Sequence, residues 1–412
     1  MPRRRLLCTR DLPETQRPRG STPPQVLTDA ILLSVDVLPL LLGRLYPSIG
    51  QLVSLFRRVC KTWHAVLTSS MPSWRDQLGQ LRLDGTFGYG DEVVGFDSPC
   101  DVEALPDGAC CVADWGSRRL QIFSRYVNLV CPSGIRLIRP ATESTFQPVA
   151  VACDGEALFV SEALAHQRVI KLRLDEGYVG GAAMLASYEF GPDDDPHRPG
   201  LAGRAIQGGS VRPGGLCVSN GTLFVCSRGL IPQSSCIHGF DLMLRKLYTF
   251  GDVGSTRRGA FRAPSAIAAH EGCLYVADEL AHHVTVWELK PGAAAQSDGI
   301  ELPSPPTFRR GIGSEGDAPG LFNGPSGVGI VGGVLVVSER SGRRVQVLTL
   351  EGGPLQVLSI GSDTNFRVCS VLGGLCVSGP RVWVADSGLS VLHALSWQRK
   401  PPAPTAEPHE PV

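Results

Sequence analysis

Five acidic residues recur at matching places in the sequence and are its best candidates for chemistry. Each ends a short apolar run, and together they are Asp114, Glu162, Asp278, Glu339 and Asp386. Carboxylate oxygens converging within about 2.6 Å of one point would bind Ca²⁺ and could serve a hydrolase. Alternatively, each carboxylate accepts backbone N–H groups of its own turn, as acidic residues in turns commonly do. We expect the second arrangement, because the acid recurs with the repeated segment around it.

The cysteines and histidines form no recognisable metal or nucleophile motif. The 13 cysteines extend from Cys8 to Cys376 without a Cys-x-x-Cys pair, which argues against a structural zinc site and a disulfide framework. Most lie in apolar runs such as Leu216-Cys217-Val218, where a thiol acts as a small buried hydrophobe. We therefore expect a reducing, intracellular location (cytoplasm, nucleus or both). We also expect no cofactor, no metal and no catalytic residue, so the protein is predicted not to be an enzyme.

The acidic residues belong to a segment that recurs six times. The copies include VAVACDGEALFVSE ending at Glu162, AIAAHEGCLYVAD ending at Asp278 and GVGIVGGVLVVSE ending at Glu339, and Ser227 replaces the acid in the third copy. Their ends are spaced by 48, 65, 51, 61 and 47 residues. Each copy predicts two strands joined by a tight turn, and a third and usually a fourth strand follow. Four short strands in each repeat of about 50 residues are typical of a β-propeller blade.

The two ends of the repeat region predict how the ring closes. The sixth copy stops after its third strand, SVLHALSW, and the chain then becomes rich in proline. Residues 82–90, RLDGTFGYG, resemble a fourth strand that lacks a blade of its own. Pairing this segment into the sixth blade would remove two open sheet edges. The predicted fold class is therefore mainly β, a six-bladed β-propeller over residues 81–398.

The repeats resemble those of the NHL family of propellers. The fifth copy carries the family's Gly-rich lead-in, its Pro-Ser-Gly-Val and its closing Arg-x-Gln-Val, and the first copy is close to it. The third departs most, because residues 228–235 replace its short turn. The resemblance covers roughly three quarters of the chain and implies a six-bladed NHL-like propeller.

The front of the chain differs in charge from the rest. Residues 1–80 carry a net charge of +6 and the remainder carries −6, although the whole chain has equal numbers of basic and acidic groups. Residues 1–24 and 399–412 have the composition of disordered tails, the first basic and the second rich in proline. Residues 25–80 place leucines at helical spacing and predict a small α-helical module in front of the propeller.

This module resembles an F-box. Residues 33–38, Leu-Ser-Val-Asp-Val-Leu, match the family's opening pattern, and Val59-Cys60-Lys61-Thr62-Trp63 matches its ending. The resemblance implies docking on the Skp-like adaptor of a cullin ubiquitin ligase, while the following domain holds the substrate. The residues expected to contact that adaptor are Leu33, Asp36, Leu38, Leu41, Leu45, Val59 and Trp63.

Two insertions interrupt the repeat on what we expect to be one face of the propeller. Residues 192–209 follow the fourth strand of the second copy, and residues 228–235 follow the second strand of the third. In an antiparallel blade the loops after strands two and four open on the same face, which also holds the acidic residues. The insertions either contact a substrate protein or are tolerated at loop tips. The candidate contacts are Asp193, Asp194, Asp195, Arg228 and Gln233.

These patterns predict an adaptor that presents a target protein to a Skp-cullin-F-box type ubiquitin ligase. The alternatives are an NHL-propeller scaffold without a ligase link and a calcium-dependent propeller hydrolase. No membrane segment is expected, since the most apolar stretch, residues 27–45, contains Asp29, Asp36 and Pro39. A body of charge −6 argues against nucleic acid as a partner, despite local basic residues such as Arg257, Arg258 and Arg262.

Overall fold

The structure is a computed structural model that describes the propeller region. The described residues are 80–88, 95–106, 108–123, 135–138, 146–163, 166–173, 183–191, 194, 211–229, 234–251, 259–290, 295–297, 300–302, 304–360, 370–378 and 381–398. All belong to Pro47–Val412, one of two units into which the chain divides. The predicted helical module, its seven adaptor-contact residues and both tails lie outside this description, except that Gln80 begins the first strand. None of the described segments is a helix of the length and apolar character that a membrane span needs.

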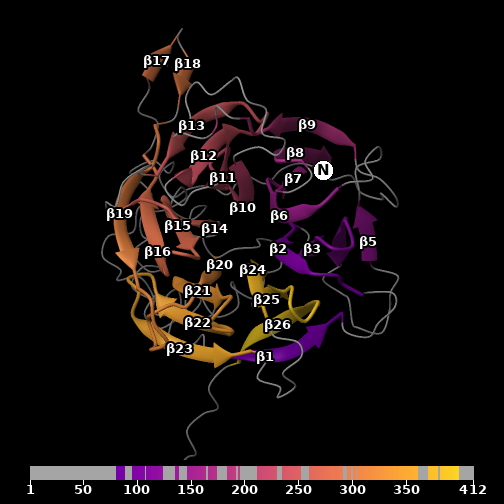
Figure 1. Cartoon of the computed structure of the whole chain (residues 1–412), viewed down its shortest axis with the longest axis vertical. Helices are drawn as coiled ribbons and strands as arrows, with labels where there is room; N and C mark the ends of the chain where they lie inside the picture. Colours follow the sequence, from indigo (N-terminus) through magenta and orange to yellow (C-terminus); the bar gives the residue numbers. More distant parts are fainter. Residues whose placement is uncertain are drawn as a thin grey trace, which may run out of the picture. The chain divides into compact units, whose positions relative to one another are not determined.

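Six four-stranded antiparallel sheets, called here blades one to six, surround a common centre (Figure 1). From the inside outward, blade one comprises β2 (Pro99–Ala104), β3 (Cys110–Asp114), β4 (Arg119–Phe123) and β5 (Ile135–Ile138). Blade two comprises β6 (Pro148–Cys153), β7 (Ala157–Glu162), β8 (Arg168–Arg173) and β9 (Met184–Glu189). Blade three comprises β10 (Val211–Ser219), β11 (Thr222–Gly229), β12 (Cys236–Asp241) and β13 (Lys246–Phe250). Blade four comprises β14 (Pro264–His270), β15 (Cys273–Asp278), β16 (His283–Glu288) and β19 (Thr307–Ile312). Blade five comprises β20 (Pro325–Val331), β21 (Val334–Glu339), β22 (Arg344–Thr349) and β23 (Pro354–Ser359). Blade six comprises β24 (Leu372–Ser378), β25 (Arg381–Asp386), β26 (Val391–Gln398) and β1 (Gln80–Phe87).

The prediction that the first strand completes the last blade is confirmed. β1 pairs antiparallel with β26 from Gln80 opposite Gln398 to Phe87 opposite Leu392. β1 also lies beside β23, the outer strand of blade five, and the Gln356 side chain bonds both backbone groups of Leu81 there. The ring therefore has no unpaired strand where it begins and ends. The six-bladed propeller is the fold of residues 80–398.

The burial of each strand follows from its radial position. The second strands are packed between neighbouring blades on both faces, so β7 and β21 are buried along their whole length and their sequences are apolar rather than alternating. The outer strands β9 and β23 have only one covered face, and their side chains alternate between half-buried and exposed. The hydrophobic core accordingly divides into six clusters among the described residues, one between each pair of adjacent blades.

A glycine after the outer strand explains the repeated Phe-Gly and Ile-Gly endings. Gly313 follows Ile312 with a φ of 74°, a region that favours glycine. A Cβ on Gly313 would lie 2.5 Å from the Phe322 ring, and one on Gly88 would lie 2.4 Å from the Phe96 ring. The glycine thus lets the chain turn while an aromatic side chain of the lead-in to the next blade packs against its backbone.

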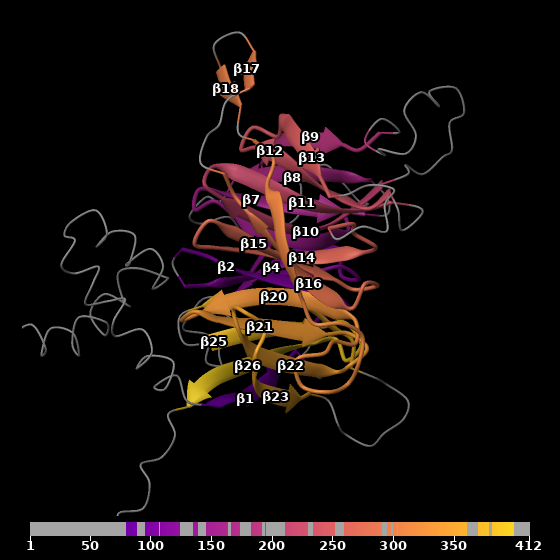
Figure 2. The same ribbon diagram turned by 90° about the vertical axis from the view of Figure 1, so that its left-hand side faces the viewer.

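The residues between β16 and β19 depart from the four-stranded pattern. They include a two-stranded hairpin, β17 (Ala295–Ser297) and β18 (Ile300–Leu302), that belongs to none of the six sheets. Figures 1 and 2 both show this hairpin projecting outward from blade four. These two short strands were not predicted from the sequence.

Candidate functional site in the central channel

The recurring carboxylates are structural in every blade that has one. All five side chains are fully buried, at 0% exposure. Glu339 accepts hydrogen bonds at Oε1 from Arg344 Nε (2.7 Å) and Gln346 Nε2 (2.6 Å), and at Oε2 from the backbone N–H of Asn323 (2.7 Å). The carboxylate thereby ties the second strand of a blade to its third strand and to its lead-in.

The other four acids make equivalent contacts. Each accepts a hydrogen bond from a backbone N–H of its lead-in: Asp97 to Asp114, Gln147 to Glu162, Arg262 and Ala263 to Asp278, and Val371 to Asp386. The acids are therefore structural anchors, as predicted, but the predicted partners are only partly correct. Asp278 and Asp386 also accept N–H groups of their own turns, whereas the backbone donors to the other three lie in the lead-ins. The described residues also contain no group of three His, Cys, Asp or Glu side chains placed to hold a metal ion. The motif that suggested a calcium-dependent hydrolase thus has another explanation.

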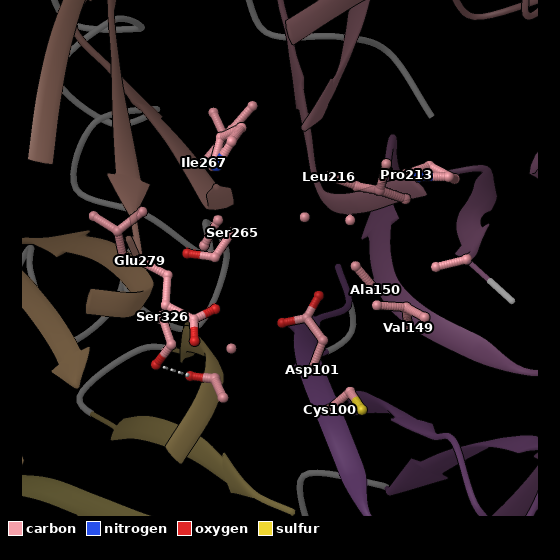
Figure 3. A pocket seen from close by; sticks show the side chains of 18 of the residues that line it. Cys100, Asp101, Val149, Ala150, Pro213, Leu216, Ser265, Ile267, Glu279 and Ser326 are labelled. Carbon is pink, nitrogen blue, oxygen red and sulfur yellow. Dashed lines mark hydrogen bonds between the residues drawn. The ribbon is translucent and has the colours of Figure 1, made fainter. Parts of the chain in front are cut away.

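A cavity of about 260 Å³ lies in the central channel, bounded by the inner strands of all six blades (Figure 3). It begins beside the turns that follow the second strands, on what we call the acid face of the propeller. Glycines and small side chains form much of its wall, including Gly214, Ser265, Ser326 and Gly373. Cys100 also lines it, but burial raises the pKa of its thiol to about 11, so it is not a thiolate at neutral pH.

Two acidic residues of blade one are exceptions in this wall. Asp101 and Glu103 lie on β2, where the other inner strands have alanine, glycine or cysteine at the corresponding register positions. Figure 3 shows the Asp101 carboxylate pointing into the cavity, and its Oδ2 accepts a hydrogen bond from the N–H of Val151 at 3.1 Å. Gly374 of blade six leaves room for it, since a Cβ there would lie 1.8 Å from Asp101 Oδ1.

Inside the channel both carboxyl groups hold their protons up to a higher pH than they would in water. Burial raises the pKa of Asp101 from 3.8 to about 7, against the opposing effect of the Val151 N–H group. Burial, and then the negative charge of Asp101, raise the pKa of Glu103 from 4.5 to about 8. At neutral pH this pair carries less than its formal charge of −2, so the channel wall is close to neutral and rich in hydrogen-bonding groups.

The mouth of the cavity on the acid face is basic. In blades two to five, the position of the recurring acid lies in the second strand, and the next residue lines the cavity. These residues are Ala163, Arg228, Glu279 and Arg340. Arg212 of β10 adds a further cation directly opposite Arg228 in the strand pairing. Arg340 forms an ion pair with Glu279 of the preceding blade, with 3.5 Å between Nε and Oε1. The formal charge of these four ionisable residues is +2.

The predicted substrate-contact residues do not all come together. Asp194 lies beside the outer strands of blades two and three, where its carboxylate accepts from Lys246 Nζ (2.6 Å), Tyr188 Oη (2.9 Å) and the Gly191 N–H (2.8 Å). It therefore joins two blades and is only 7% exposed. Arg228, in contrast, lies at the channel mouth. Asp193, Asp195 and Gln233 lie outside the described residues.

Sequence reasoning missed Asp101, Glu103 and Arg212. Aligning the first strands of the six copies would have revealed the two acids, since they stand alone among small residues in the repeat. Arg212 precedes the proline that opens the inner strand, and the same position holds Gln147, Ala263 and Gly324 in blades two, four and five. The signal was therefore a departure from the repeat, whereas the acids that follow the repeat proved to be structural.

Comparison with known proteins adds likenesses of structure only. No protein-family model and no curated protein matches the sequence. Among solved structures, a streptogramin B lyase is 12% identical, with a TM-score of 0.46 over 77% of this chain and 98% of the lyase. The WD40 β-propeller domain of Doa1 is 10% identical, with a TM-score of 0.46 over 77% and 97%. A PQQ-bound aldose sugar dehydrogenase from Streptomyces coelicolor is 12% identical, with a TM-score of 0.45 over 77% and 98%. These neighbours include enzymes and a WD40 domain, so they do not distinguish catalysis from binding.

Proposed function

We propose that this protein is a substrate-recognition adaptor of a Skp-cullin-F-box type ubiquitin ligase. In this proposal the NHL-like propeller holds a target protein, and residues 25–80 dock on a Skp-like adaptor. The chain itself carries out no catalytic step and works in the cytoplasm, the nucleus or both.

One structural observation supports a separate module in front of the propeller. Residues 80–398 supply all four strands of every blade, including the closing strand β1. The preceding segment, with its Val59-Cys60-Lys61-Thr62-Trp63 pattern, is therefore not needed to complete a blade. We infer that the apolar stripe predicted for this segment serves a partner, because helix-in-groove docking uses such a stripe.

The propeller supports the second half of the proposal by its inner surface. Its recurring acids are occupied within their own blades, as described above, and its channel combines a basic mouth with a nearly neutral interior. This arrangement provides groups for recognition by charge and hydrogen bonds. It does not present the convergent set of metal ligands that the hydrolase alternative requires in the described residues.

Co-purification of the full chain with a Skp-like adaptor and a cullin tests the proposal. Leu38→Ala and Trp63→Ala remove two predicted anchors, and loss of such anchors should weaken capture by about 30-fold or more. Thr62→Ala is the matched control, because Thr62 occupies the variable position of the Val-Cys-Lys-x-Trp pattern. If the wild type does not capture the adaptor but does capture other proteins through the propeller, the scaffold alternative holds.

A further inference from the structure

Two arginines face each other across strands at the mouth of the channel. Arg212 on β10 and Arg228 on β11 are directly paired in register, and both are exposed and line the cavity. Within the part of the chain that the structure describes, neither forms an ion pair. Like charges directly opposite each other in a sheet destabilise it. An anion bound between them would relieve this repulsion.

Blade three also lacks the carboxylate that accompanies the other blades. In blades one, two and five the turn acid pairs with an arginine that begins the third strand, as Glu162 does with Arg168 at 2.7 Å. In blade three the register partners at this place are Ser227 and Cys236, so both members of the ion pair are absent. Arg228 follows Ser227 directly, and no acid of its own turn neutralises it among the described residues. Arg212 and Arg228 therefore have no ion-pair partner among the described residues, and this blade offers no carboxylate at the place where the others carry one.

Further cations extend the basic mouth along blades four and five. Arg262 lies exposed in the lead-in to blade four, and its Nη1 donates to the Leu280 carbonyl at 3.3 Å. Leu280 itself is 38% exposed on the same turn as Glu279. The Arg340 side chain is 46% exposed even though it pairs with Glu279. The surface beside the cavity thus offers several cations and an apolar side chain, which suits a partner larger than a free ion.

We propose that Arg212 and Arg228 bind a carboxylate of an acidic segment of the target protein, with the acidic side chain entering the channel cavity. This inference rests on the proposed role of the propeller in holding a target. Arginine forks match carboxylate oxygens in a bidentate geometry. The cavity behind them is wide enough for a side chain, and Asp101 is only partly ionised at neutral pH, so its repulsion of an anion is weaker than that of a full negative charge.

A protein segment fits this mouth better than single-stranded RNA does. Sequence-tolerant RNA binding combines a basic groove with aromatic side chains on which the bases stack. Among the described residues that line the cavity, none is aromatic.

Binding of a fluorescein-labelled hexaglutamate peptide to the full chain tests the proposal, with hexaglutamine as the uncharged probe. Arg212→Gln/Arg228→Gln should raise the Kd for hexaglutamate at least about tenfold at low salt. The matched control is Arg245→Gln/Arg381→Gln, which changes net charge equally at the opposite face of the propeller, in the turn between β12 and β13 and at the start of β25. It should leave the Kd within about twofold. Arg212→Lys/Arg228→Lys keeps the charge but removes the forks and should weaken binding by an intermediate amount.

Several outcomes would overturn the inference. These are no hexaglutamate binding by the wild type at about 1 mM, equal losses in the two Gln double variants, and tighter binding of oligouridylate than of hexaglutamate through Arg212 and Arg228. Glutarate binding without peptide binding would replace the protein segment with a small carboxylate. Leu38→Ala/Trp63→Ala should bind hexaglutamate like the wild type, so failure of Skp-like docking and failure of this site are separable.

Discussion

Replacing Asp101 with asparagine should make the protein less sensitive to rising pH. The Asp101 carboxyl has a pKa of about 7 in the folded protein, raised by burial from 3.8. Between these two values the folded state keeps a proton that the unfolded state releases. Folding stability contributed by this group therefore falls as pH rises from about 4, and the full loss is reached above about 7. An asparagine side chain at this position cannot ionise, and its amide oxygen can still accept the hydrogen bond from Val151.

The size of the effect follows from the two pKa values. The difference between 3.8 and about 7 corresponds to at most about 4 kcal/mol of unfolding free energy, of which about 2.5 kcal/mol develops between pH 5 and pH 8. Asp101 is half-buried and lines a channel, where solvent screening reduces the cost of its charge. We therefore expect the unfolding free energy of Asp101→Asn, relative to that of the wild type, to rise by about 1–2 kcal/mol between pH 5 and pH 8. Glu103 acts in the same direction, because removing the Asp101 charge lowers its raised pKa.

Urea unfolding of both proteins, followed by tryptophan fluorescence at pH 5, 6, 7 and 8, measures this difference. Glu156→Gln is the control, since this exposed acid lies in the hairpin between β6 and β7. Its stability difference from the wild type should stay constant over the same range. A constant difference for Asp101→Asn as well would refute the reasoning, because it would mean that the carboxyl ionises equally well in the folded channel and in water.

Three further predictions concern the framework around the channel, each measured as a change in urea midpoint. Gly313→Ala should lower the free energy of unfolding by about 1–3 kcal/mol or more, because φ is positive there and a Cβ would collide with Phe322. Gly311→Ala is the control, since no atom lies within 4 Å of its Cβ, and it should cost about 1 kcal/mol or less. Equal costs would contradict the packing argument. Glu339→Gln should cost about 3–5 kcal/mol of stability, because the Arg344 guanidinium would stay buried without its carboxylate. The control is Glu315→Gln at an exposed acid. A loss no greater than that of the control would argue against the anchoring role of Glu339. Gln356→Ala should cost about 2 kcal/mol of stability, about 1 kcal/mol for each hydrogen bond to Leu81. It should also speed hydrogen exchange of the Leu81 amide. Unchanged exchange would show that this contact does not hold the closing strand.

Much of the propeller could be predicted from particular residues. The apolar runs that end at Asp114 or Glu339 identified second strands correctly, and the orphan Phe-Gly ending near residue 88 identified the closing strand. These predictions succeeded because a buried strand and its tight turn leave a local pattern that recurs in every blade. The hairpin β17–β18 left no such pattern, since it occurs once and joins no blade.

The candidate site was predicted less well, because its residues meet only through the ring. Asp194 and Arg228 both lie within insertions in the sequence, yet one pairs with Lys246 between outer strands and the other lines the channel. Radial position cannot be derived from the fact that a residue lies in an insertion. It depends on which strand of the blade the residue borders and on how closely the neighbouring blade packs there.

The sequence by itself determined the number of blades, the closure of the ring and the role of the recurring acids, because each depends on local patterns repeated along the chain. It also established the change of net charge near residue 80. Only the tertiary structure placed Asp101 and Glu103 in one cavity wall and set Arg212 against Arg228 at its mouth. A propeller channel is assembled from six strands far apart in sequence. The burial that raises the pKa of Asp101 therefore arises only when the ring is closed, whereas the contact between Arg212 and Arg228 needs only the pairing of β10 with β11.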